Sequence, residues 1–223
     1  MNKKTIPLFL MAAVPLLTAL LLSQSSETQI QEPSKSIPLE VDEKNHPEPP
    51  PTPTPPNLII EGARAVIAND TEYYETYEKL GYPNGDVPLH YGVCTDLIVR
   101  SFRHIDVDIQ KLLHEDRTRN PDAYPTHLWE YKKADKNIDH RRCQNLVIWF
   151  DRNAESISTE EPSAWKLGDV IFFIRDKQSH PWHVGIISSE GEPQPRMIHL
   201  FPPRANEDLV ERYGTVHSVY RWG

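Results

Sequence analysis

Three kinds of residue are scarce in this sequence, and each scarcity excludes a class of protein. Two cysteines in 223 residues cannot build the disulfide framework of a small secreted domain. The nine glycines form none of the fingerprints of phosphate loops or dinucleotide sites. Lys and Arg number 24 against 32 Asp and Glu, and the net charge of −8 makes nucleic acid a poor partner.

The distribution of the scarce residues divides the chain in two. Residues 1–56 contain none of the nine glycines and none of the five tryptophans, but 11 of the 21 prolines. Residues 57–223 are therefore expected to fold, and they are long enough for one domain of ordinary size. No internal repeat is visible, and we expect a monomer.

The first 26 residues predict a signal peptide or an N-terminal membrane anchor. Lys3 and Lys4 precede an apolar run over 6–22, and polar residues end it. No further cation occurs before Lys35, so the positive-inside rule places the N-terminus in the cytoplasm and the rest outside. We expect an exported, periplasmic protein, tethered to the inner membrane if the segment is not cleaved. A buried helix of the domain is the alternative, and the proline-rich stretch that follows disfavours it.

Residues 27–56 are expected to be a linker. Nine prolines lie within residues 33–56, and such a segment is an extended, semi-rigid polyproline II chain with no apolar face to bury. It would hold the domain away from the membrane. A ligand for SH3-type domains is the other use of such a segment, and export argues against it.

Within the domain, the hydrophobic pattern changes from helical to strand-like along the chain. Apolar spacings of three and four predict helices over 57–69 and 94–104, while 106–145 alternate short helical pieces with polar loops. The apolar residues 146–152 fit a strand or a helix equally well. Strands are predicted over 170–174, 183–188, 197–200 and 216–221. This order indicates an α+β fold, with N-terminal helices packed on a small antiparallel sheet.

Cys94 is the residue that most directly indicates chemistry. It stands where a glycine-containing loop meets the start of the helix predicted over 94–104, with Asp96 in the first turn. The unpaired N–H groups of a helix N-terminus stabilise a thiolate and can hold the oxyanion of a tetrahedral intermediate. Cys94 is therefore a candidate nucleophile, although a buried, inert cysteine fits the position equally well.

Two histidines interrupt apolar strands further along the chain. His183 is followed by Gly185, which would leave this face open to another chain or to a substrate. A histidine there could take the proton of a thiol and return it to a leaving amine, or it could be a core residue bonded to a carbonyl. His199 lies in the next strand. A hairpin centred on Gly191 would place it directly opposite His183, where it could fix the tautomer.

A cysteine on a helix followed by histidines on two neighbouring strands is the chain order of papain-like peptidases. Residues 73–221 also resemble a specific bacterial family, domain-of-unknown-function family 1287. The matching stretches are YPNGDVP (82–88), GVCTD (92–96), NIDHRR (137–142), WKLGDV (165–170), HVGI (183–186) and the terminal YR (220–221).

The resemblance implies a fold and a function. The family is similar to the NlpC-type cell-wall cysteine peptidases, which implies a papain-like domain over 57–223 that hydrolyses amide bonds in peptidoglycan peptides. It assigns Cys94 as the nucleophile, His183 as the base and His199 as the orienting residue. The sequence departs from the family pattern at LFPP (200–203), where the family usually has a polar, glycine-rich stretch.

Five further residues are candidates for holding the substrate: Asp96, Tyr77, Asp86, Arg141 and Arg142. Arginine forks bind carboxylates well, and peptidoglycan peptides carry several. Each candidate also has a structural explanation. The arginines fit an ion-pair cluster that holds a loop, Asp86 fits a turn, and Tyr77 fits the core.

The second cysteine, Cys143, falls in a predicted loop with no matching histidine, and we expect no catalytic role for it. A Cys94–Cys143 disulfide would inactivate the protein reversibly in an oxidising compartment, and the sequence leaves its formation open. A zinc site would use four ligands: Cys94, His180, His183 and His199. No second tight ligand pair and no HExxH motif supports it, so we expect no cofactor.

The sequence therefore predicts an exported cysteine hydrolase that cleaves amide bonds in peptidoglycan peptides through a thioester. A cysteine acyltransferase or transpeptidase on the same scaffold is one alternative, in which an amine replaces water. A non-catalytic module that binds the cell wall is another, and in it Cys94 would be inert.

Overall fold

The computed structural model describes residues 55–129, 133–190 and 194–223. The predicted signal peptide or anchor (1–26) and nearly all of the predicted linker (27–56) lie outside these residues. No helix within the described ranges is long and apolar enough to cross a membrane.

Four α-helices precede the central strands in the chain: α1 (Pro55–Ala68), α2 (Cys94–Arg103), α3 (Ile109–Arg119) and α4 (Cys143–Asn153). Short 3₁₀ turns lie between the longer elements: η1 (Pro121–Ala123), η2 (Thr126–Leu128), η3 (Asp139–Arg141), η4 (Pro162–Ala164) and η5 (Val210–Tyr213). The helices predicted over 57–69 and 94–104 are confirmed within two residues at each end.

Two helices differ from the prediction, for local reasons. The first begins at Pro55 because proline lacks only a donor that the first helical turn leaves unpaired. Residues 109–119 form one helix rather than short pieces, and the Asp108 side chain caps it by accepting a hydrogen bond from the Lys111 N–H at 3.3 Å. The undecided segment 146–152 lies within α4 and is helical.

The strands form one curled sheet in the order β2-β1-β7-β6-β5-β4-β8-β3. Their bounds are β1 (Glu72–Tyr73), β2 (Tyr91–Gly92), β3 (Glu155–Ile157), β4 (Val170–Ile174), β5 (His183–Ile187), β6 (Arg196–Phe201), β7 (Arg204–Leu209) and β8 (Thr215–Arg221). Only β1 and β2 pair in parallel among the strands described. The α+β class is confirmed, whereas the sheet is larger than expected and includes one parallel pair.

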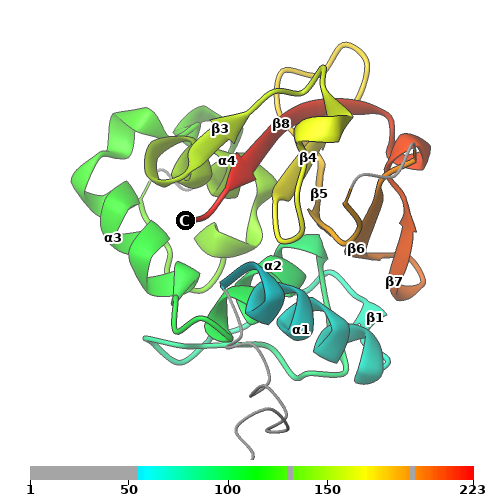
Figure 1. Ribbon diagram of the computed structural model, residues 1–223. Helices are drawn as coiled ribbons and strands as arrows, with labels where there is room; N and C mark the ends of the chain where they lie inside the picture. The colour runs from blue at the N-terminus through cyan, green and yellow to red at the C-terminus, as the bar shows by residue number, and fades with distance from the viewer. Residues whose placement is uncertain (1–54, 130–132, 191–193) are drawn as a thin grey trace, which may run out of the picture. The chain divides into compact units, whose positions relative to one another are not determined.

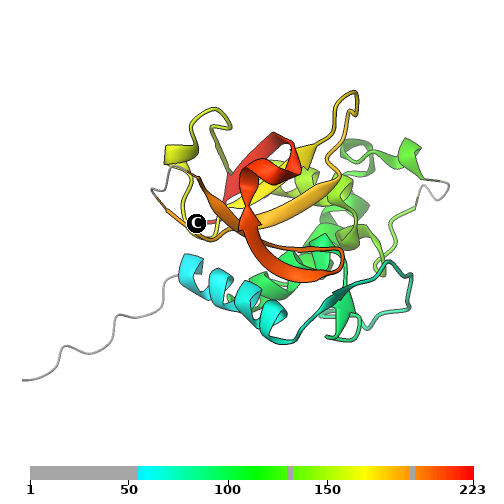
Figure 2. The same ribbon diagram turned by 90° about the vertical axis from the view of Figure 1, so that its right-hand side faces the viewer.

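Both faces of the central strands are buried, so the sheet fixes the site firmly. In β4, Val170 and Phe172 pack against the helices, while Ile171 and Phe173 join a second apolar cluster on the opposite face. Figure 2 shows α1, in cyan, and α2 beneath the sheet, and the order of the labelled strands can be followed in Figure 1. Helix α2 packs on β5 and β6, which brings its N-terminus to the middle of the sheet.

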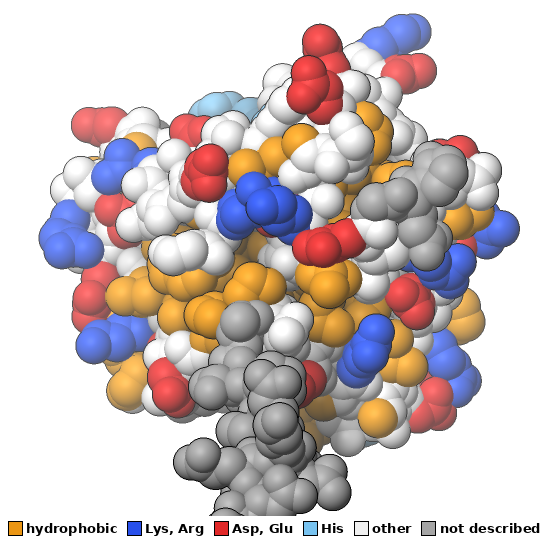
Figure 3. Space-filling view, viewed as in Figure 1, with side chains coloured by type: hydrophobic (Ala, Val, Ile, Leu, Met, Phe, Trp, Pro, Cys, Tyr) orange, Lys and Arg blue, Asp and Glu red, His pale blue; other side chains and the backbone are white. Residues whose placement is uncertain are grey.

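The surplus of acidic residues does not gather on the face that Figure 3 shows. Acidic and basic side chains are interspersed there, with apolar side chains between them. A local charge within a pocket can therefore differ in sign from the whole protein.

Candidate functional site

The N-terminus of α2 holds Cys94 against the sheet. Cys94 is the first residue of the helix and is 6% exposed. The Asp96 carboxylate accepts a hydrogen bond from the Val93 N–H at 2.7 Å, which fixes the turn that enters the helix. Glycine is needed at position 92, because a Cβ on Gly92 would lie 2.9 Å from Asp96 Oδ2. The first N–H groups of a helix lack partners within it, so the sulfur lies at the positive end of the helix dipole.

His183 and His199 meet on one face of β5 and β6. His183 Nε2 lies 2.8 Å from His199 Nδ1, and both side chains are buried. The predicted register is wrong, since His199 pairs with Gly185 and the hairpin is not centred on Gly191. The two rings still meet because residues two apart on a strand share a face.

Gly185 serves a different purpose from the one expected. A Cβ there would lie 2.7 Å from Met197 Sδ and 3.3 Å from His199 Cβ. The face that was predicted to be open to a substrate is therefore filled by β6. The glycine allows β5 and β6 to approach so closely that the histidines can bond diagonally.

Burial and the neighbouring His183 lower the pKa of His199 to about 4, so this imidazole is neutral near pH 7. Its Nε2 is buried without a hydrogen-bond partner among the described residues, and Asn206 of β7 is its cross-strand neighbour. A neutral ring protonated at Nε2 accepts a hydrogen bond at Nδ1. That tautomer makes His183 Nε2 the donor and leaves His183 Nδ1 as the nitrogen that can carry the second proton of an imidazolium or give it up.

The surroundings of Cys94 favour a thiolate. A hydrogen bond from Cys143 is the largest cause that lowers the pKa of Cys94, burial opposes it, and His183 lowers the pKa further, to about 5. The backbone of Val184 lowers the pKa slightly as well. At neutral pH this sulfur is therefore ionised, which is the state needed for nucleophilic attack.

Cys143 is the second sulfur of the site. The prediction that Cys143 lies in a loop is wrong, because Cys143 is the first residue of α4. Its Sγ lies 3.5 Å from Cys94 Sγ, and both cysteines are free. The hydrogen bond with Cys94, burial and the Cys94 charge all raise the pKa of Cys143, so it remains a protonated donor. No sequence pattern signals this contact, because the two residues lie 49 positions apart.

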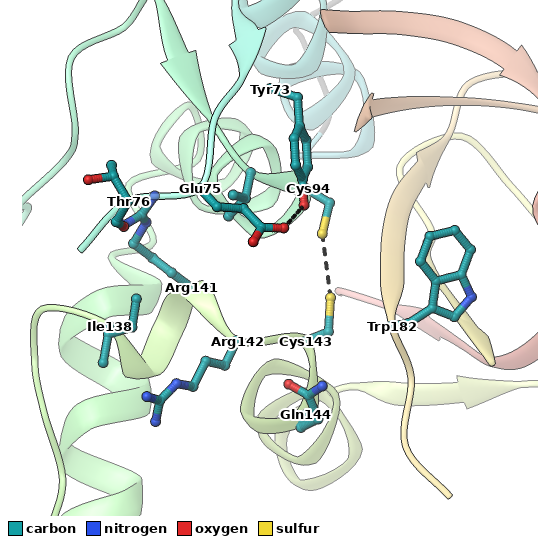
Figure 4. Close-up of a pocket in the computed structure, with 11 residues that line it drawn as sticks. Tyr73, Glu75, Thr76, Cys94, Ile138, Arg141, Arg142, Cys143, Gln144 and Trp182 are labelled. Atoms are coloured by element: carbon teal, nitrogen blue, oxygen red, sulfur yellow. Dashed lines mark hydrogen bonds between the residues drawn. The ribbon is translucent and has the colours of Figure 1, made fainter. Parts of the chain in front are cut away.

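Both sulfurs line a pocket of about 240 Å³. Figure 4 shows Trp182 on one side of the sulfurs and Arg141 and Arg142 on the other. The other lining residues are Tyr73, Glu75, Thr76, Val93, Ile138 and Gln144. A ligand in this pocket can therefore touch Cys94, whereas neither His183 nor His199 is among the residues that line it.

Two of the predicted substrate-binding residues bind each other. Arg141 Nε and Nη2 donate to the Asp96 carboxylate at 2.8 and 2.9 Å, and Nη1 donates to the Thr76 carbonyl at 2.7 Å. Both side chains are buried. This is the structural explanation given above for Arg141, and it makes the pair a clamp between α2 and η3.

Asp86 and Tyr77 lie outside the sulfur pocket. Asp86 accepts hydrogen bonds from Arg100 Nε at 3.0 Å and from Arg103 Nη1 at 2.6 Å. Tyr77 is exposed, and its hydroxyl donates to Asp135 Oδ2 at 3.0 Å beside a neighbouring pocket. The sequence reasoning did not assign Glu75 or Trp182 to the site, because neither interrupts a hydrophobic pattern.

Within the part of the chain that the structure describes, no three His, Cys, Asp or Glu side chains are arranged to hold a metal ion. His180, one of the four possible zinc ligands, lies against His127 instead, with ring centroids 6.0 Å apart. His183 Nε2 and His199 Nδ1 bond each other, so neither of these two nitrogens is available to a metal ion.

The fold and the site define an α+β protein in which a helix-terminal cysteine adjoins two hydrogen-bonded histidines. The chain belongs to the family described as Domain of unknown function (DUF1287), whose model matches residues 60–222. It is similar to the uncharacterized protein YijF of Escherichia coli (strain K12), with 39% identity over 155 residues, which are 68% of this chain and 74% of that protein. The family resemblance drawn from the motifs over 73–221 is thereby confirmed.

Proposed function

We propose that the protein is a cysteine hydrolase with a papain-like, NlpC-type arrangement, and that it cleaves amide bonds in peptidoglycan peptides. The observation that carries the proposal is Cys94 at a helix N-terminus, with His183 lowering its pKa and His199 hydrogen-bonded to His183. The two histidines lie on adjacent strands, and the three residues follow the chain order of papain-like enzymes.

The proposed reaction has two halves. The Cys94 thiolate attacks the carbonyl carbon, and N–H groups at the start of α2 hold the oxyanion of the tetrahedral intermediate. Collapse breaks the C–N bond, protonated His183 gives its proton to the leaving amine, and a thioester remains. Water then loses a proton to His183 and attacks the thioester, which releases a carboxylic acid and restores Cys94.

We further propose that this reaction takes place in the periplasm. Support comes from the N-terminal pattern, in which Lys3 and Lys4 precede an apolar run. Wall peptides are amide substrates of that compartment, and an acidic domain on a proline-rich spacer could reach them from the membrane. Cell fractionation of the full chain is the direct measurement, and recovery in the cytoplasm would contradict this placement.

The test uses purified sacculi and the full chain, with released fragments identified by mass spectrometry. We expect each bond that the wild type cleaves to leave one new carboxyl group on one product and one new amine on the other. Cys94→Ala should abolish release, and His183→Gln should slow it at least a hundredfold. His217→Gln is the matched control, because His217 is exposed on β8 and lines none of the pockets described here. Equal release by Cys94→Ala and wild type would refute the proposal.

A further inference from the structure

Arg142 differs from Arg141 in that its guanidinium makes no hydrogen bond to a carboxylate of the described residues. It lies over the ring of Trp129, 4.2 Å from the centroid, and its nearest carboxylate in the described chain is Asp139, at 3.8 Å. At that distance the contact is an ion pair without a good hydrogen bond. Among the described residues its N–H donors find no acceptor within hydrogen-bonding distance.

The nearby carboxylate is already engaged by other groups. Asp139 is buried and accepts hydrogen bonds from Arg117 and from the Asp135 N–H. Asp139 thus faces the two guanidinium groups of Arg117 and Arg142, and Asp135 lines the neighbouring pocket together with Arg142. Burial lowers the pKa of Arg142, Asp139 and Asp135 oppose this, and Arg117 lowers the pKa further.

Arg142 also stands in the right place to contact a substrate. It immediately precedes Cys143, whose sulfur touches Cys94, and its side chain lines the sulfur pocket. The same side chain lines the adjoining pocket beside Tyr77 and Ile138. In Figure 4 it extends from the sulfurs on the side opposite Trp182. A chain lying across Cys94 would therefore pass Arg142 on that side only.

On the basis of the proposed function, we propose that Arg142 binds a free carboxylate of the substrate beside the amide bond that Cys94 attacks. The planar fork offers paired N–H donors that match a carboxylate, and stacking on Trp129 fixes its plane. The substrate class is then a peptide amide flanked by a carboxylate, and not a neutral peptide of the same length. In an acidic protein, this local cation supplies the attraction that the net charge opposes.

The inference can be tested by binding, without any turnover. The full chain carrying Cys94→Ala is titrated calorimetrically with soluble wall peptides from sacculi and with the same peptides after conversion of their carboxylates to primary amides. We expect the amidated peptides to bind roughly ten- to a hundredfold more weakly, as for loss of charge-assisted hydrogen bonds. Adding Arg142→Gln should remove this difference. Arg142→Lys should restore part of it, because it returns the charge without the fork.

Arg119→Gln is the matched control, since Arg119 is exposed at the end of α3 and lines none of these pockets. It should leave the preference for carboxylates unchanged. If Arg142→Gln does not fold, Arg142→Lys is titrated with the two peptide preparations instead. A weaker preference for the carboxylate form than in the parent protein would support the inference, and an unchanged preference would contradict it. Equal binding of the two preparations, no binding of either, or a preference that persists in Arg142→Gln would overturn the inference.

The same titration separates this inference from the proposed function. Preference for carboxylates that depends on Arg142, in a protein that releases nothing from sacculi, would leave the carboxylate site standing and refute the hydrolase. Release from sacculi at equal rates before and after amidation would support the hydrolase and refute the carboxylate site. A purely structural Arg117–Asp139–Arg142 cluster would lower the unfolding midpoint of Arg142→Gln without changing peptide preference, and this outcome also overturns the inference.

Discussion

The ionisation of Cys94 depends on a second cysteine as well as on the histidine that the mechanism uses. The hydrogen bond from Cys143 is the largest single cause of the lowered pKa, and His183 lowers the pKa through a hydrogen bond and through its charge. A protonated thiol 3.5 Å away is a donor that needs no charge of its own, and burial keeps water from competing with it. Cys143 is therefore a positioning and electrostatic partner, although the sequence predicted no role for it.

We predict that alkylation will separate the two thiols. Cys94 has its pKa lowered to about 5 and the pKa of Cys143 is raised, so iodoacetamide at pH 6 should label only Cys94. Its rate should fall as the pH decreases through about 5. Cys143→Ala removes the main donor, and the whole profile should move to higher pH. Peptide mapping gives the labelled residue, and equal, slow labelling of both cysteines would contradict the thiolate.

For individual residues, the sequence revealed those reactive side chains that interrupt an apolar pattern. Cys94, His183 and His199 do so, and each could be assigned a role before the structure. Cys143 could not, because its contact with Cys94 depends on how α2 and α4 are placed in the fold. Residues that act through tertiary contacts leave no local signal.

Among the secondary-structure elements, α2 is held at its N-terminus by a buried ion pair. Arg141 of η3 binds Asp96 with two hydrogen bonds, and the same carboxylate caps the helix. Removal of one partner leaves the other charge buried without compensation, which costs far more than the net stabilisation that such a pair contributes. The pair therefore fixes the helix that carries Cys94.

We predict that Asp96→Asn will lower the free energy of unfolding by about 3–5 kcal/mol, because it leaves the Arg141 guanidinium buried and unpaired. Asp70→Asn is the control, since Asp70 pairs with Arg204 at a site where both side chains are about half exposed or more. Its effect should stay below about 1 kcal/mol. Urea unfolding gives both values, and similar shifts in the two variants would show that the Asp96 pair is not a clamp.

We predict that the first residues of α2 and α4, whose sulfurs lie 3.5 Å apart, also form a redox-sensitive pair. In the presence of a small disulfide oxidant, the Cys94 thiolate attacks one sulfur of the oxidant and expels a thiolate. Cys143 then attacks the mixed disulfide and gives its proton to the second leaving thiolate. The products are a Cys94–Cys143 disulfide and two reduced thiols of the oxidant.

We predict that glutathione disulfide will remove two hydrogens from the wild-type mass and block alkylation of Cys94, and that a reductant will reverse both changes. Cys143→Ala cannot complete the second step, so it should retain one glutathione as a mixed disulfide. Intact-mass spectrometry distinguishes the two products. A stable mixed disulfide on the wild type would mean that the sulfurs do not reach each other.

The elements that could be predicted were those in which apolar residues recur at the spacing of a helix or of a strand. Strands β4, β5 and β6 are almost wholly apolar, and α2 has a clear stripe. Strand β7 was missed because RANEDL (204–209) has no apolar alternation and is held by pairing with β6. In α4 the run LVIWF (146–150) is apolar on all sides, so its period could not be seen; only packing against α3, β8 and η3 selects the helix.

For the molecule as a whole, buried neutral histidines connect stability to pH. Burial is the main cause that lowers the pKa of His140 to about 3 and that of His199 to about 4. In the unfolded chain both groups take up a proton near pH 6.5. Protonation of the unfolded chain alone favours unfolding, so this stability is complete above about pH 6.5 and is lost as the pH falls toward the folded-state values.

We predict that the free energy of unfolding will fall by roughly 2 kcal/mol for each of these histidines between pH 6.5 and 4.5. Aspartates whose pKa is lowered, such as Asp116 and Asp208, lose their contribution only below about pH 4. The pKa of His217 is also lowered and adds to the decline, whereas burial raises the pKa of Asp139 and opposes it. His140→Gln cannot take up a proton, and its urea midpoint should fall less steeply than that of the wild type. Parallel profiles for the two proteins would show that His140 is protonated in the folded state, and the decline would then have to arise from other groups.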